Sequence, residues 1–280
     1  MSSIPLKTHE ERLRSAEFDL VRHEFNTEDK VLEIGGGSGF QAALISECVQ
    51  ECQSVDVRPH PQPVHPVSIY DGKILPFEDQ SFDIIFSSNV LEHISDLDDA
   101  LYECARVLKP GGKMVHVVPS HWWRIWTLLS YYPALPKILL CGLRDLRKPD
   151  ASDAELSRPL ESTGVKEQNQ QRDDEQGLLA IVQRRFKLKW IRTIVLSPRH
   201  GERGNEITEI YYFSPSWWRR MFERNGWCVL EETPCHLFYS GNTLFGSILS
   251  IKMRRLLSRF LGSSTYIYKV SLPTHKSEDI

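Results

Sequence analysis

The chain has 280 residues, of which 41% are hydrophobic and 25% are charged, and its formal net charge is −3. This balance is ordinary for a folded globular protein and argues against a disordered or fibrous class. The small net charge gives no overall electrostatic reason to expect nucleic acid as a partner. The length allows one large domain or one domain that carries an insertion, and we favour the second.

The first third of the chain alternates between strand and helix signals. Residues 8–25 predict an amphipathic leading helix. A β-branched run at 30–34 ends at a glycine cluster, and 40–49 then favour a helix. Further strands are predicted at 54–57, 64–69 and 82–87. This alternation predicts a mainly parallel sheet with helices on its faces.

A further helix is predicted before the fifth strand. Apolar side chains recur at helical spacing at Leu97, Leu101, Cys104 and Leu108. Ser95 is placed to cap the start of this helix, and Pro110 with the two glycines that follow it is placed to end it. Residues 113–118 then predict the fifth strand.

The regular alternation stops after the fifth strand. The apolar, aromatic segment 122–143 is interrupted by Arg124, Pro133, Pro136 and Lys137, which a membrane-spanning helix of about 20 residues rarely tolerates together. Its aromatic side chains form the core of a cap or line a pocket, and a core is the commoner use. Residues 147–177 are almost entirely polar, which predicts a mobile loop.

Strand and helix signals return near the C-terminus. Ser214 as a cap and Pro215 at the first helical position predict a helix that ends before Gly226. Strands are predicted at 227–230 and 265–270. We therefore predict a Rossmann-like three-layer α/β sandwich with a mostly parallel seven-stranded sheet. Its core comprises 1–119 and 214–280, and 120–213 form a cap and acceptor region inserted after the fifth strand.

The turn between the first strand and its helix carries a glycine-rich motif. Gly35, Gly37 and Gly39 lack side chains, so a ligand can approach the backbone amides there. A dinucleotide fingerprint requires a further glycine where Phe40 stands. Asp56 closes the second strand, where a carboxylate can accept hydrogen bonds from ribose hydroxyls, although alone it would be read as an exposed turn residue. Together these features predict a nucleotide or nucleoside site.

Four segments in order resemble the class I S-adenosylmethionine-dependent methyltransferases, in the subgroup related to ubiquinone biosynthesis. They are VLEIGGGSGF, SVDV, YDGKILPFEDQSFDIIFSSNVLEHI and ALYECARVLKPGGKMV, and the resemblance covers roughly residues 30–119. It implies S-adenosylmethionine as the cofactor. It implies that Asp56 holds the ribose, that Asp71 meets the adenine amino group and that Asn89 lies beside the cofactor. The residues implied around the methionine part are Glu33, Gly35, Gly37 and Gly39.

The chemistry of methyl transfer requires positioning more than acid–base help, because a sulfonium methyl is already activated. An oxygen acceptor still has to lose its proton, and histidine suits that role near neutral pH. His93, His121 and His200 compete for it, and we retain His121 and His200 as catalytic candidates, although a structural role is the commoner use of a histidine. Glu92 and His93 are adjacent, but no further carboxylate stands beside them, so the sequence predicts no metal.

The expected acceptor is a small molecule, a saccharide or a lipid-linked compound that binds in the inserted region. Residues 251–260 alternate basic and apolar side chains, as a solvated helix face does and as a surface that rests on anionic lipid does. The N-terminus lacks an apolar signal segment, which favours the cytoplasm, with peripheral contact at the inner membrane face as an alternative. Two rival functions stay open: a non-catalytic cofactor-binding scaffold, and a nicotinamide-dependent oxidoreductase, which the glycine spacing opposes.

Overall fold

The computed structural model describes residues 8–145, 198–240 and 248–273. The chain divides into two compact units, Met1–Thr127 with Arg199–Ile280, and Leu128–Pro198. The loop predicted at 147–177 lies outside the described residues. Within the described parts of the chain, no helix is both long enough and apolar enough to cross a membrane.

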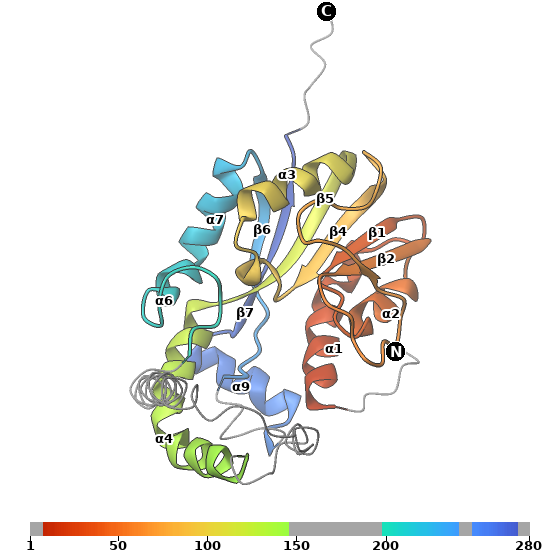
Figure 1. Ribbon diagram of the computed structural model, residues 1–280. Coiled ribbons are helices and arrows are strands. Elements are labelled where there is room, and N and C mark those ends of the chain that lie inside the picture. The colour runs from red at the N-terminus through yellow and green to blue at the C-terminus, as the bar shows by residue number, and fades with distance from the viewer. Residues whose placement is uncertain (1–7, 146–197, 241–247, 274–280) are drawn as a thin grey trace, which may run out of the picture. The chain divides into compact units, whose positions relative to one another are not determined.

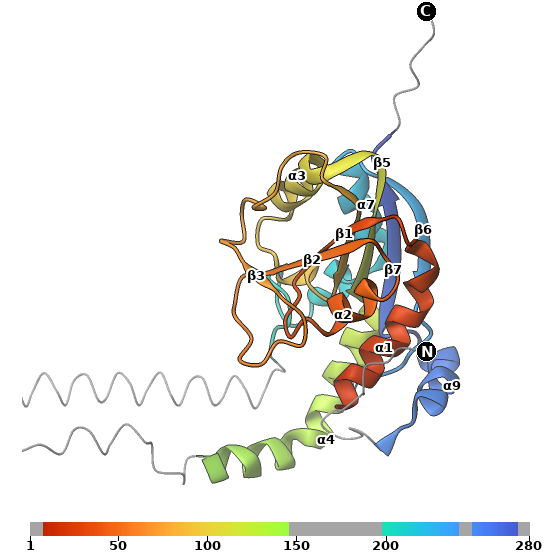
Figure 2. The ribbon, with the colours of Figure 1, turned by 90° about the vertical axis from the view of Figure 1, so that its right-hand side faces the viewer.

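The first unit is built on a seven-stranded sheet with the strand order β3-β2-β1-β4-β5-β7-β6. The first five strands of this order pair in parallel, and β7 runs antiparallel to both β5 and β6. Figure 2 shows β3 and β2 at one edge of the sheet. The predicted fold class is therefore confirmed. The strands are β1 (Lys30–Ile34), β2 (Glu51–Asp56), β3 (Ser68–Ile69), β4 (Phe82–Ser88), β5 (Leu108–Pro119), β6 (Cys228–Pro234) and β7 (Thr265–Ser271).

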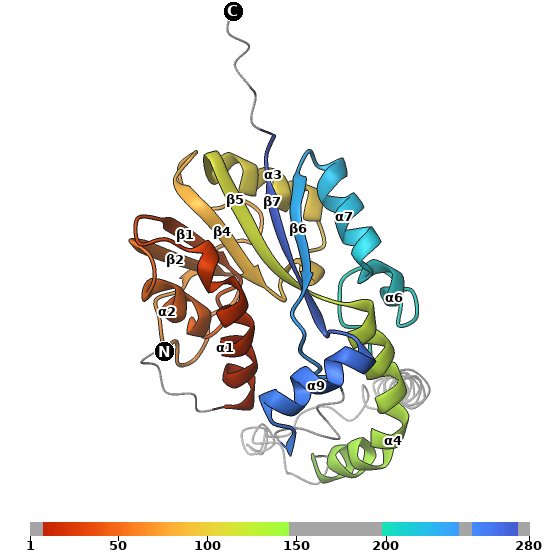
Figure 3. The ribbon, with the colours of Figure 1, turned by 180° about the vertical axis from the view of Figure 1, so that it is seen from behind.

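Helices cover both faces of this sheet because its central strands are apolar on both sides. Neighbouring residues such as Ile84 and Ile85 point to opposite faces and are both buried. One face packs against α1 (His9–Val21) and α2 (Phe40–Ser46), and the other packs against α3 (Leu97–Val107) and α7 (Pro215–Arg224). Views from the front and the back show α3 on one face and α1 on the other (Figures 1 and 3). The remaining described helices are η1 (Arg22–Glu24), η2 (Leu91–His93), α4 (His121–Asp145), α6 (Glu209–Tyr212) and α9 (Ile251–Leu261).

The predicted ends of α3 are wrong. Asp96, and not Ser95, is the N-cap, and its carboxylate accepts a hydrogen bond from the backbone of Asp99. The helix stops at Val107 and not at Pro110, because Leu108 already pairs with Phe82 in the sheet. Strand pairing therefore ends this helix before the proline and glycine signals are reached.

Other boundaries also differ from those predicted. The helix expected over 40–49 ends at Ser46, and the strand expected over 64–69 is reduced to Ser68–Ile69. The backbone amide of Val64 donates to the carbonyl of Ser38, so this part of the segment bonds to the glycine-rich turn and not to a neighbouring strand. The cap of α7 is as predicted, since the Ser214 hydroxyl accepts from the backbone of Trp217.

Candidate functional site

A cavity of about 600 Å³ opens at the carboxyl ends of the parallel strands. This is where open α/β sheets bind their ligands, and the volume lies within the range of small-molecule sites. Its charged lining consists of Asp56, Asp71, Asp96 and Lys73, together with the titratable His93. Because three carboxylates face one ammonium group, the cavity favours a ligand that carries positive charge.

The glycine-rich turn forms one wall of this cavity through Gly35. Gly35 has a φ of +77°, and a Cβ atom at this position would lie 2.2 Å from the Val90 side chain, so only glycine fits. Its amide donates to the carbonyl of Val55, while the amide of Gly37 donates to the Asp56 carboxylate at 2.8 Å. The turn is thus tied to β2, and the second of these bonds orients Asp56.

Two of the predicted turn residues and Glu33 do not line the cavity. Gly39 is instead the N-cap of α2, with a φ of +74°. Glu33 is buried behind the turn, where its carboxylate accepts a hydrogen bond from the Ser54 hydroxyl at 2.6 Å. Burial raises the pKa of Glu33 to about 7, and the nearby charge of Asp56 adds to this effect. The role that the resemblance implies for Glu33 therefore stays a prediction.

The residues predicted around the adenosine do meet in the cavity wall. Asp56 ends β2, and its second carboxylate oxygen accepts from the backbone of Arg58 at 3.0 Å. Asp71 is exposed, and hydrogen bonds from the backbone of Lys73 and Ile74 hold its pKa below the ordinary value. Tyr70 also lines the cavity, and burial raises its pKa to about 12.

Asn89 follows β4 and lines the same cavity. It has a φ of +54°, a left-handed conformation that asparagine tolerates better than most residues. Its backbone N–H donates to the carbonyl of Val117 at 2.7 Å, which places this turn beside β5. Carboxylates at the ends of β2 and β3 and an amide side chain at the end of β4 fit a cofactor that has ribose hydroxyls, an adenine amino group and a sulfonium charge.

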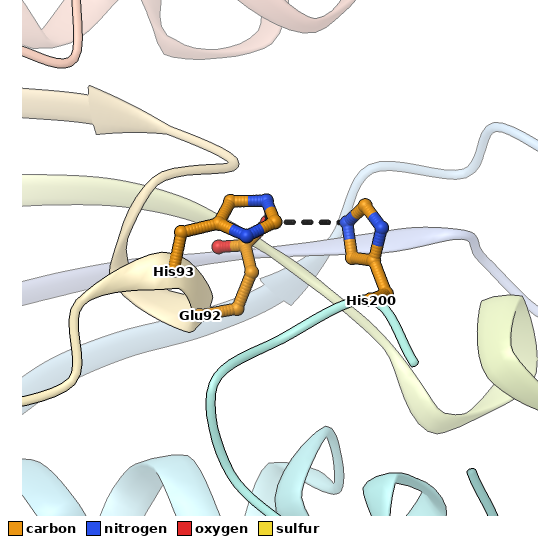
Figure 4. Close-up of side chains that lie close together, drawn as sticks. All are labelled: Glu92, His93 and His200. Carbon is orange, nitrogen blue, oxygen red and sulfur yellow. Dashed lines mark ion pairs between the residues drawn. The ribbon is translucent and has the colours of Figure 1, made fainter. Parts of the chain in front are cut away.

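The fold brings one predicted base next to a pair of residues from a distant segment. His200 lies beside Glu92 and His93 of η2, as Figure 4 shows. The Nε2 atoms of both histidines lie 3.8 Å from Oε1 of Glu92, and the two imidazole rings are 4.7 Å apart between centroids. Since His93 also lines the cavity, this cluster stands at its edge.

The other predicted base, His121, does not line the cavity. Its ring lies 5.0 Å from that of Trp122, and burial lowers its pKa. Its Nδ1 atom is buried and has no hydrogen-bond partner among the described residues. A catalytic role for His121 stays a prediction.

A buried ion pair, which the sequence analysis did not foresee, holds the segment that carries His200. One oxygen of Glu209 accepts from the backbone amides of His200 and Gly201 at 2.8 and 2.7 Å. Its other oxygen lies 2.9 Å from Nε of Arg124, and both side chains are buried. The guanidinium of Arg203, in the same segment as His200, donates to the carbonyl of Ile94 at 2.7 Å and so joins this segment to the turn after η2. The available signal was Arg124, a charged residue near the start of the apolar, aromatic run.

Comparison with known proteins agrees with the fold. The family described as a methyltransferase domain matches residues 32–116. An uncharacterized methyltransferase of Bacillus subtilis is 38% identical over 106 residues, which cover 34% of this chain and 42% of the relative. A demethylmenaquinone methyltransferase of Corynebacterium urealyticum is 35% identical over 91 residues, which cover 31% of this chain and 40% of the relative.

The chain thus spans less than half the length of these two curated relatives. Among solved structures, a putative methyltransferase in complex with the Haloferax volcanii Trm112 activator is 15% identical, with a TM-score of 0.50 over 96% of this chain and 95% of that one. At this identity the likeness concerns the fold alone. Residues 32–116 therefore match a methyltransferase domain of the S-adenosylmethionine-dependent kind, and the fold and the cavity agree with that match.

Proposed function

We propose that the protein transfers the methyl group of S-adenosylmethionine to a hydroxyl oxygen of a small-molecule, saccharide or lipid-linked acceptor. The observation that carries this proposal is the position of the cluster of Glu92, His93 and His200 at the edge of the acidic cavity. A hydroxyl acceptor must lose its proton during the transfer, so a nearby group that can act as a general base is needed.

The residues of the cavity act by binding and orienting. Asp56 and Asp71 place carboxylates where ribose hydroxyls and an adenine amino group would be held, and the excess of negative charge attracts a cationic cofactor. When bound, the cofactor supplies a methyl group activated by its sulfonium charge. The acceptor oxygen would take the methyl group and give up its proton, while the electron pair of the broken carbon–sulfur bond would stay on the departing sulfur.

The released proton is handled at the histidine cluster. His200 is the predicted base that lies in contact with a cavity-lining residue, since its ring packs against that of His93. Glu92 lies within 3.8 Å of both imidazoles and provides negative charge there. We therefore retain His200 as the first catalytic candidate.

Calorimetric titration of the full chain with S-adenosylmethionine and S-adenosylhomocysteine tests the cofactor assignment. We expect both to bind, and Asp56→Asn to weaken binding about 10- to 100-fold, because a hydrogen bond to a charged group contributes about 1.5–3 kcal/mol. Asp19→Asn is the matched control, since Asp19 is an exposed aspartate on α1. Equal weakening by both variants would contradict the assignment.

Two rival functions are distinguished by the same preparation. Binding of a nicotinamide dinucleotide in place of both S-adenosyl compounds would overturn the methyltransferase proposal. Transfer of a labelled methyl group to sugar, quinone or lipid acceptors is then measured with the isolated chain. Cofactor binding without transfer to any acceptor class would favour the non-catalytic scaffold.

A lipid-linked acceptor is favoured by the exposed face of α9. Arg254, one of the basic residues of this helix, is buried and donates to the carbonyl of Phe238 at 3.0 Å. Lys252, Arg255 and Arg259 are exposed, and so is Phe260, at 80%. Exposed basic and aromatic side chains on one helix suit peripheral contact with anionic lipid, so we extend the proposal to such contact.

Co-sedimentation with vesicles tests this contact. We expect binding to phosphatidylglycerol vesicles but not to phosphatidylcholine vesicles, and loss of binding in Arg255→Glu. The control is Arg58→Glu, which changes an exposed arginine on the loop after β2. Loss of transfer to a lipid-linked acceptor without loss of vesicle binding in Arg255→Glu would count against the membrane role.

A further inference from the structure

We propose that Glu92, His93 and His200 bind one divalent metal ion, with zinc as the best match to the ligands. These three side chains come from η2 and from the segment before α6, and they meet only in the folded chain (Figure 4). One ligand atom from each lies within 4.8 Å of the other two. The sequence had predicted no metal because it showed only Glu92 and His93 together.

The spacing of the ligand atoms suits a transition-metal ion. Zinc binds imidazole nitrogen and carboxylate oxygen at about 2.0–2.2 Å, so ligand atoms around a tetrahedral ion are roughly 3.3 Å apart. Oε1 of Glu92 lies 3.8 Å from Nε2 of each histidine. The ligand atoms all lie within 4.8 Å of one another, so side-chain rotations that shorten the two Glu–His distances by about 0.5 Å, and the His–His distance by up to about 1.5 Å, would close the site.

The environment of Glu92 is a second and independent indication. The residue is 2% exposed, and neither carboxylate oxygen has a hydrogen-bond partner among the residues that the structure describes. A distance of 3.8 Å to each imidazole is too long for a hydrogen bond. Since a buried carboxylate requires hydrogen bonds, a counter-charge or a metal ion, a cation between the three side chains satisfies it.

The protein frame around the cluster positions the ligands. The amide of Glu202 donates to the carbonyl of Glu92 at 2.9 Å, so the two ligand segments are joined by their backbones. A Cβ atom on Gly201 would lie 2.9 Å from the same carbonyl, so glycine permits this close approach. Glu209 then holds the amide of His200 from the other side.

The ligand types select among ions. Two imidazoles and one carboxylate are typical of catalytic zinc sites and of non-haem iron sites. Magnesium and calcium prefer oxygen ligands, and this cluster offers oxygen from one side chain only. Three protein ligands leave at least one coordination position of zinc for water or substrate oxygen.

The position at the cavity edge suggests what the ion does, and this step rests on the proposed function. A cation held partly by His93 lies beside the cavity that His93 lines. With the ion bound, Nε2 of His200 is a ligand and no longer accepts a proton, so the cation takes over the role proposed above for His200 as a base. A hydroxyl oxygen bound to such a cation has a lowered pKa, so it loses its proton to solvent more readily and becomes a better nucleophile toward the methyl group. The same three residues would thereby favour an oxygen acceptor over a carbon acceptor.

Metal binding can be measured without cofactor or acceptor. The full chain is treated with a chelator, dialysed and titrated with zinc, and separately with cobalt, whose visible absorption reports nitrogen and carboxylate ligands. We expect one ion per chain, at least 10-fold weaker binding in His200→Gln and in His93→Gln, and no effect of a large excess of magnesium. His60→Gln is the control, because His60 is exposed and lies outside the cluster.

The circular dichroism spectrum and the melting temperature of every variant are recorded to detect misfolding. Because His93 and His200 lie on different segments, one variant still tests the site if the other misfolds. The absence of stoichiometric zinc binding, or equal affinity in the wild type and both cluster variants, would overturn the metal site. Zinc binding that the cluster variants weaken, with no methyl transfer to any acceptor, would refute the proposed function and support the metal site.

Discussion

Replacing Glu33 with glutamine tests the burial of this carboxyl group through the pH dependence of folding. The side chain lies beneath the glycine-rich turn, accepts a hydrogen bond from Ser54 and is 2% exposed. Burial raises its pKa from 4.5 to about 7, and the charge of Asp56 acts in the same direction. Glutamine keeps a similar shape and can still accept from Ser54, but it cannot ionise.

The sign follows from proton binding. Between pH 4.5 and about 7 the folded chain keeps the Glu33 proton while the unfolded chain loses it, so the free energy of unfolding falls as the pH rises through this window. One pKa unit corresponds to about 1.4 kcal/mol, which makes the total loss about 3 kcal/mol above pH 7. The stabilisation is complete below pH 4.5 and absent above about pH 7.

The assay is urea unfolding of the wild type and Glu33→Gln without cofactor at several pH values between 4 and 8.5. Contributions of the other titrating groups cancel in the difference between the two proteins, so we expect this difference to move by about 3 kcal/mol in favour of the glutamine variant as the pH rises. A difference that does not change with pH would refute the assignment of a raised pKa to Glu33.

Two predictions concern the segment that holds His200. Glu209→Gln should lower the free energy of unfolding by about 3 kcal/mol in urea denaturation, because it removes a buried negative charge beside Arg124. The control is Asp98→Asn, which breaks an exposed ion pair with Arg224 and should lower the free energy of unfolding by less than about 1 kcal/mol. Equal losses in the two variants would contradict this reasoning. Gly201→Ala should displace the His200 segment, since its Cβ would lie 2.9 Å from a backbone oxygen, and should reduce methyl transfer at least 10-fold while cofactor affinity, measured by calorimetry, is retained. Unchanged transfer in Gly201→Ala would show that the close approach is not needed.

The predicted parts of the fold and site are those whose signals are local in the chain. The β-branched run before Gly35 and the cap-and-proline pair at Ser214 and Pro215 each specify their element through neighbours a few residues away. The family resemblance assigned Asp56, Asp71 and Asn89 to the cofactor, and the structure brings them into one cavity because parallel strands end at the same edge of a sheet. Where pairing with a distant segment decided the boundary, as the pairing of Leu108 with β4 does at the end of α3, the prediction was wrong.

By itself the sequence determined the seven-stranded fold class, the glycine-rich turn and the cavity residues at the ends of β2 and β4. Only the tertiary structure brought His200 to Glu92 and His93, and only it paired Arg124 with Glu209. The physical reason is that these contacts join positions far apart in the chain, and neither spacing nor periodicity carries information about such pairs. These contacts depend on burial, because a buried charged group requires a partner and the tertiary fold determines which residue is close enough to be that partner.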